Sequence, residues 1–210
     1  MKLGDIKAAA LKLMFASYDR DITAETVDSL RGDAAFRDYL YNMPQAINRA
    51  FGIIENKRVL PERTVDYLPN GSNHIAVPLT VEAVTGAPGG EFKRVIYSAC
   101  GRINWVPFTD YVVSDGEVIL PSVVAGEAYR VCYAPRLARI TAETSDLMEI
   151  PIPDDVAALI PYFVKGDLYR EEDAAEASNA RNWFDAGLEE IECSRIGMPS
   201  GVATVFGGMI

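Results

Sequence analysis

The sequence has little of what most catalytic and metal sites require. It contains one histidine in 210 residues, His74, which lies in a turn-like NGSNHI segment. Because no cysteine or second histidine stands at ligand spacing from it, we expect a loop residue at a strand start rather than a general base or metal ligand. The patterns GxSxG, GxxxxGK[ST] and GxGxxG are also missing. We therefore expect a protein that is not an enzyme and that uses no cofactor and no metal.

The cysteines are few, odd in number and widely spaced. Cys100, Cys132 and Cys193 form no CxxC pattern. Free thiols in a reducing compartment are the simplest interpretation, and a single disulfide between Cys100 and Cys132 is the alternative.

Basic residues are outnumbered. The chain has 20 Lys and Arg against 30 Asp and Glu, a net charge of −10 and a pI near 4.6. This argues against a nucleic-acid clamp, which needs basic side chains clustered on one face. It allows DNA to pass close by, since a negative surface repels DNA and keeps it from adhering.

No apolar run approaches the roughly 20 residues needed to span a bilayer. The N-terminal MKLGDIKAAALKLMFAS is interrupted by Asp5, Lys7 and Lys12 where a signal peptide would be continuously apolar. It fits an amphipathic helix instead, and we expect the chain to remain in the cytoplasm in which it is made.

Residues 1–60 read as helical. Periodicity and capping residues predict helices over Leu3–Ser17, Thr23–Leu30 and Asp33–Lys57. Pro44 lies inside the third pattern. It either kinks that helix or starts a new first turn with Asn42 as the cap.

Residues 61–150 read as antiparallel β structure, because β-branched residues, alternation and turn signals dominate. The sharpest turn signal is Asp115-Gly116, which suits a two-residue hairpin with positive φ. The expected strands are Thr64–Leu68, Ile75–Val84, Glu91–Ser98, Ile103–Val106, Tyr111–Val113, Glu117–Leu120, Ala128–Tyr133 and Met148–Ile150.

Residues 151–196 return to helix, with an apolar stripe that runs on into Trp183, Phe184, Leu188 and Ile191. One continuous helix from Asp155 to Ile191 would be about 55 Å long; the alternative is a break near Gly166 or Glu172. The acidic run REEDAAE within it is best explained as a solvated helical face.

Residues 197–210, GMPSGVATVFGGMI, carry no charged side chain. Left in water, this tail would expose Val202, Val205, Phe206, Met209 and Ile210. We expect these five residues to contact a partner or a sister subunit, with strand addition as one way of doing so.

Together these segments predict an α+β protein. The N-terminal part (1–60) and the C-terminal long helix (151–196) would form a helical bundle. An antiparallel β-sandwich or barrel-like domain (61–150) would be inserted between them, and an extended tail (197–210) would follow. Within the β region, Trp105 and Tyr111 near Arg102 and Asn104 suit either sandwich-core packing or a sugar-stacking platform, and we favour the core.

Two stretches resemble a known family. They are ALKLMFASYDRDIT…DYLYNMPQAINRAFGIIENKRVLP and VCYAPRLARIT…SDLMEIPIPDDVAALIPYFVKGDLYREEDAAEASNARNWFDAGLEEI. Together they cover about half of the chain and look like the head-to-tail connector (adaptor) proteins of tailed bacteriophages, of the tail tubular protein A-like kind. The middle region matches this family only in class.

The resemblance implies a virion structural protein in the neck of a phage, made in the host cytoplasm. Such a protein binds the portal and forms a ring, commonly of twelve subunits, that continues the DNA channel toward downstream tail or nozzle proteins. DNA passes through without specific binding, the tail reaches the portal, and genome ejection follows this route. The family has no catalytic residues to carry over.

A channel suits the acidic chain, and we expect Glu171, Glu172, Asp173 and Glu176 to face the lumen. The alternatives are another tail-tube or tail-completion component, a carbohydrate-binding β-module built on Trp105 and Tyr111, and an enzyme with a concealed pair of carboxylates.

Overall fold

The chain forms two compact units. A computed structural model describes residues 1–16, 21–57, 59–69, 74–78, 91–98 and 105–196. The first unit, which is helical, joins Met1–Leu60 to Leu137–Ile196, and the second, the β unit, contains Pro61–Arg136. The predicted mixture of helices and antiparallel sheets is confirmed.

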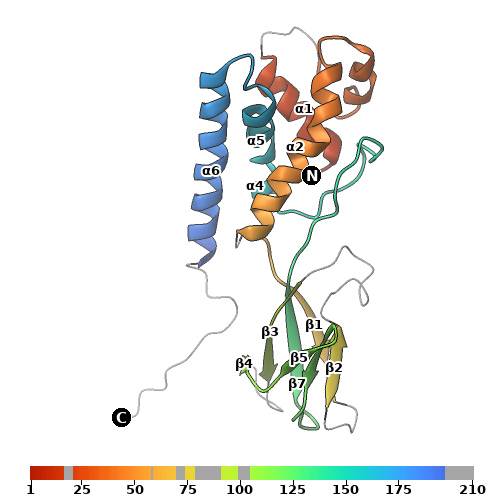
Figure 1. Cartoon of the computed structure of the whole chain (residues 1–210), viewed down its shortest axis with the longest axis vertical. Coiled ribbons are helices and arrows are strands. Elements are labelled where there is room, and N and C mark those ends of the chain that lie inside the picture. Colours follow the sequence, from red (N-terminus) through yellow and green to blue (C-terminus); the bar gives the residue numbers. More distant parts are fainter. Residues whose placement is uncertain (17–20, 58, 70–73, 79–90, 99–104, 197–210) are drawn as a thin grey trace. The chain divides into compact units, whose positions relative to one another are not determined.

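The helical unit is built from both ends of the chain (Figure 1). Its buried side chains form one apolar core, to which α1, α2 and α5 contribute Leu3, Phe51 and Phe163, among others. Helix α5 packs against α1, α2 and α6. The elements are α1 (Leu3–Met14), η1 (Val27–Gly32), α2 (Arg37–Asn56), α4 (Asp154–Ala157), α5 (Ile160–Leu168) and α6 (Ala174–Ile196). No helix in the described ranges is long and apolar enough to cross a membrane.

The second predicted helix is wrong. Instead of an α-helix over Thr23–Leu30, the chain makes a turn and then the 3₁₀-helix η1. The Thr26 hydroxyl accepts a hydrogen bond from the Thr23 backbone N–H (2.8 Å) and donates one to the Asp21 carbonyl (3.0 Å). Threonine side chains that bond to nearby backbone compete with helix formation in this way.

Pro44 lies inside α2, so the helix does not restart there. Asn42 is not a cap: its side-chain amide donates to the Asp38 carbonyl one turn earlier (2.9 Å). Pro44 is buried, and it lacks the N–H that would otherwise bond to the carbonyl of Leu40.

The predicted long C-terminal helix is wrong as a single rod. It divides into α4, α5 and α6, and the turn between α5 and α6 lies near Glu172. Gly166 of α5 lies against Ala177 and Arg181 of α6, whereas Gly187 farther along α6 lies against Leu159 at the start of α5. The two helices therefore run antiparallel, side by side (Figure 1). Folding back buries Phe184 and Leu188 of the apolar stripe against the unit's own core, whereas Trp183 stays exposed.

Residues 137–150 belong to the helical unit, so the β segment ends at Arg136 rather than at Ile150. Leu137, Ile140 and Ile150 are buried in the helical core. The expected strand Met148–Ile150 is reduced to one bridge, between Glu149 and Lys2. Burial among the helices, rather than sheet pairing, decides the path of this segment.

The β unit contains two antiparallel sheets. One has four strands in the order β1-β7-β3-β4 and the other has three in the order β2-β6-β5. The strands are β1 (Arg63–Tyr67), β2 (Ile75–Pro78), β3 (Glu91–Ser98), β4 (Val106–Phe108), β5 (Val112–Ser114), β6 (Glu117–Leu120) and β7 (Ala128–Ala134). Residues 79–84 and 103–104 of the predicted strands lie outside the described ranges.

Both sheets contribute to one apolar core. Val77 and Val118 of the smaller sheet and Tyr129 and Val131 of the larger are all at most 1% exposed. The predicted hairpin turn is confirmed: Asp115 has φ 51° and Gly116 has φ 81°, the left-handed region that this turn requires.

Candidate interaction surface

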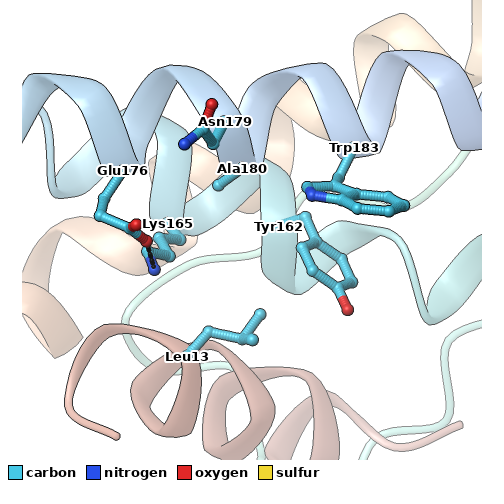
Figure 2. A pocket seen from close by; sticks show the side chains of 7 residues that line it. All are labelled: Leu13, Tyr162, Lys165, Glu176, Asn179, Ala180 and Trp183. Carbon is cyan, nitrogen blue, oxygen red and sulfur yellow. Dashed lines mark hydrogen bonds and ion pairs between the residues drawn. The ribbon is translucent and has the colours of Figure 1, made fainter.

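A shallow groove lies on the helical unit where α1, α5 and α6 meet (Figure 2). Its volume is about 270 Å³. Seven side chains line it, from α1 (Leu13), α5 (Tyr162, Lys165) and α6 (Glu176, Asn179, Ala180, Trp183). We call it the Trp183 groove.

Trp183 is the prominent residue of this groove. Its neighbour Phe184 is fully buried and Leu188 is 1% exposed, so α6 turns that face into the core. Adjacent helical residues point about 100° apart, and Trp183 is consequently 68% exposed. In Figure 2 its ring lies close to that of Tyr162, which gives the groove an aromatic end.

The other end of the groove is polar. Lys165 Nζ and Glu176 Oε2 form an ion pair at 2.8 Å, drawn as a dashed line in Figure 2. Asn179 lies between this pair and Trp183 along α6. Trp and Tyr side chains are enriched in protein interfaces, so the exposed Trp183 ring makes this groove a candidate contact surface.

The four predicted lumen acids lie around the α5–α6 turn, not along one helical face. All four are exposed. Glu172 accepts a hydrogen bond from the Tyr39 hydroxyl. Asp173 Oδ1 caps α6 by accepting from the backbone N–H groups of Ala175 (3.0 Å) and Glu176 (2.9 Å). The chain reverses here, so the sequence-based picture of a continuous acidic helix face is wrong.

The structure gives no position for the predicted contact residues of the tail. Val202, Val205, Phe206, Met209 and Ile210 lie outside the described residues. His74 is exposed just before β2. Across the described ranges, no three His, Cys, Asp or Glu side chains are grouped as metal ligands would be.

The aromatic rings considered for sugar stacking are engaged within the β unit. The Arg130 guanidinium lies 4.2 Å from the centroid of the Trp105 ring. The Tyr111 ring packs edge-on against Phe92 at 5.3 Å. A sugar platform needs open ring faces, so this arrangement favours the packing interpretation.

Ion pairs cross the larger sheet on strands β1, β3 and β7. The Arg130 guanidinium donates two hydrogen bonds to the Asp66 carboxylate (2.6 and 2.8 Å). These hydrogen bonds are the main reason that the pKa of Asp66 is lowered. Burial raises the pKa of Glu62, but Lys93 (2.6 Å) and Arg94 (3.0 Å) outweigh it and leave that pKa lowered.

Cys132 and Cys193 are free thiols, and burial raises the pKa of Cys132. Cys100 lies outside the described residues. The two thiols that the structure describes are therefore not paired with each other.

Sequence reasoning missed Trp183 as a surface residue because it lies inside an apolar stripe. The available signal was its neighbour: Trp183 and Phe184 are consecutive, and one helix cannot turn both rings into the same core.

Comparisons with known proteins give no identification. No family model matches the sequence. No curated protein matches it either.

Proposed function

We propose that this chain is a head-to-tail adaptor of a tailed bacteriophage, a virion protein that binds the portal and forms a ring around the DNA path. The observation that carries the proposal is where the two adaptor-like stretches lie. One supplies the end of α1 and nearly all of α2, the other α4, α5 and most of α6. Both lie mainly in the helical unit, although the second begins at Val131, in β7 of the β unit. Most of the residues on which the resemblance rests thus contribute to one apolar core.

In this proposal the helices form a ring-building bundle and the β unit is an outward-facing sandwich or barrel-like module. A ring uses two different patches on each copy, since its contacts run head to tail. The Trp183 groove supplies one patch, because a large exposed aromatic side chain is a common anchor of protein interfaces.

The acidic side chains at the α5–α6 turn serve the DNA channel by repelling phosphate. Testing this by charge reversal at all four positions would confuse two effects. Asp173 caps α6 and Glu176 pairs with Lys165, so lysine at either position would also disturb the helical unit. Glu171→Lys is the cleaner change, because residue 171 is an exposed turn residue. It should slow genome ejection. Glu190→Lys, at an exposed position of α6, is the matched control.

The experiment that tests the adaptor function mixes the purified chain with the portal protein of the same genome and images the product by electron microscopy. A collar below the portal supports the proposal. Portals that stay bare over a range of salt and protein concentrations would reject it.

The C-terminal tail takes part in the same contact. Deleting Met198–Ile210 should leave a folded protein that no longer stays on the portal. Circular dichroism checks the fold, and sedimentation with portals checks the binding. Undiminished binding by the truncated chain would remove the tail from the interface.

A further inference from the structure

Among the described strands of the β unit four lie at sheet edges, and one of them differs from the other three. The edges are β1 and β4 in the larger sheet and β2 and β5 in the smaller. Proteins protect edge strands with proline or charge, since bare edges accept further strands. Strand β2 contains Pro78, β4 contains Pro107, and β1 carries Arg63 and Asp66. Strand β5, Val112–Ser114, contains neither proline nor charge.

The backbone of Val113 faces the open edge. Ser114 pairs with Glu117 across the two-residue Asp115-Gly116 turn, and Val113 pairs with Val118. In such a hairpin the pair next to the turn exchanges both hydrogen bonds, and the following pair exchanges none. The N–H and C=O of Val113 therefore point away from β6, toward the position that a further strand would take.

The side chain of Val113 lies at the edge of the β core. Val77, Val118 and Val113 are opposite one another on three neighbouring strands, so they share one face of the sheet. Val77 and Val118 are fully buried, whereas Val113 is 50% exposed. On the opposite face, Val112 is 57% exposed. The core of the β unit thus reaches its boundary at β5, whose outer backbone edge pairs with no other described strand and whose two valine side chains are about half exposed.

We propose that β5 receives residues Val202–Phe206 of a neighbouring copy as an added strand. This segment reads VATVF, five uncharged residues rich in β-branched side chains, with Gly201 before it and Gly207-Gly208 after it. The glycines mark natural limits for a short strand. Backbone pairing supplies the affinity in this mode of recognition, and alternate side chains supply the fit.

Charge favours this donor over most other segments of the chain. Asp110, Asp115 and Glu117 flank β5 and are exposed, so an acidic strand would be repelled. Between the end of α6 and Val202 lie Gly197–Gly201, which span up to about 17 Å when extended. A donor tail and an acceptor edge at different places on one chain are what a head-to-tail ring contact needs.

This inference rests on the proposed ring and deepens it. It assigns Val202, Val205 and Phe206 to the neighbouring copy, and it leaves Met209 and Ile210, beyond the two glycines, for the portal.

Cross-linking tests the contact. In a Cys100→Ser, Cys193→Ser background, Val113→Cys is combined in turn with a cysteine at each position from Val202 to Phe206. Each double variant is treated with a short bis-maleimide, both alone at high concentration and after incubation with portals. We expect dimers and higher species on denaturing gels. Their yield should alternate along the tail with a period of two, because successive strand residues face opposite sides.

Controls separate strand addition from mere proximity. Val106→Cys on β4, the edge that contains Pro107, should give little linkage with the same tail cysteines. In a Val112→Cys variant, the further change Val113→Pro removes the outward N–H and should abolish linkage without removing a hydrogen bond of the hairpin. Links confined to single chains, yields without alternation, or no links in either sample would each overturn the proposal.

Microscopy of the same portal mixtures keeps this test separate from that of the proposed function. Collars without alternating cross-links reject the strand exchange alone. Alternating cross-links without collars reject the adaptor function alone.

Discussion

Lys7 and Asp146 are 139 residues apart in sequence and form an ion pair inside the helical unit, with Nζ and Oδ1 separated by 2.5 Å. The Lys7 side chain is 2% exposed and that of Asp146 is 12% exposed. The backbone carbonyl of Asp146 also accepts a hydrogen bond from Gly4 (2.8 Å). The segment that leaves the β unit is thereby fastened to the first helix.

Breaking this ion pair should destabilise the helical unit markedly. Among the described residues, Lys7 is the close partner of Asp146, because the nearest nitrogen of Arg31 is 4.0 Å away. Lys7→Met removes this partner. Leaving one buried charge without its partner costs about 3 kcal/mol. Urea unfolding measures the loss. Lys12→Met on the exposed side of α1 is the control and should change stability by less than about 0.5 kcal/mol. Equal effects of both substitutions would contradict the assigned role of the pair.

Three helical glycines should respond differently to alanine. At Gly166 a Cβ would lie 3.0 Å from the Ala177 carbonyl and 3.2 Å from the Arg181 backbone nitrogen, and neither backbone atom yields easily. Gly166→Ala should therefore cost about 1–3 kcal/mol by forcing α5 and α6 apart. Gly187→Ala should cost less, because it meets only the flexible tip of Leu159. Gly52→Ala meets nothing within 4 Å and should stabilise α2 by up to about 1 kcal/mol. Thermal melts give the order, and a different order would disprove the packing assigned to the α5–α6 pair.

Trp183 should matter for association and not for folding. Because its side chain is 68% exposed, Trp183→Ala should alter unfolding by less than about 0.5 kcal/mol. As an interface anchor it should weaken collar formation by more than about 2 kcal/mol, or roughly 30-fold. Titration of portals followed by sedimentation measures this. Tyr41→Ala, which changes a side chain that is 74% exposed on α2, is the matched control. Unchanged binding by Trp183→Ala would remove the groove from the interface.

The β unit should lose stability in acid partly through Asp66. Its pKa is lowered in the folded state, chiefly by Arg130. Between the folded pKa and the unfolded pKa of about 3.9, Asp66 is therefore protonated more in the unfolded chain than in the folded one. The stabilisation is present above about pH 4 and is lost as the pH falls through the folded pKa. Asp66→Asn should lower stability at pH 7 by at most about 1 kcal/mol, since the pair is partly exposed. It should also flatten the decline in stability as the pH falls below about 4. Urea unfolding at several pH values checks both effects, with Asp115→Asn in the turn as the control.

Local signals predicted the elements that are governed by neighbouring residues. Regular apolar spacing gave α1 and α2 nearly to their ends, and the Asp-Gly dipeptide gave the turn between β5 and β6. These features depend on backbone preferences and on periodicity that are legible within a dozen residues.

The errors arose where distant contacts decide the structure. Nothing local requires residues 137–150 to leave the sheet, because their burial among the helices depends on α1 and α2. The sequence allows a break between α5 and α6 as well as a continuous helix. The packing of Gly166 against α6, which sequence spacing does not reveal, favours the break. The Trp183 groove draws on three helices, and sequence spacing does not predict such convergence.

The strands that begin and end the inserted segment are neighbours: Arg63 of β1 lies opposite Tyr133 of β7. Their Cα atoms are therefore only about 5 Å apart. For the helical unit, the whole insertion therefore acts as a loop whose two ends are held close together. The entropic cost of closing that loop does not depend on how many residues lie beyond the β1–β7 ladder. Segments between Tyr67 and Ala128 are free to lengthen, shorten or diverge over evolution without penalty to the helices.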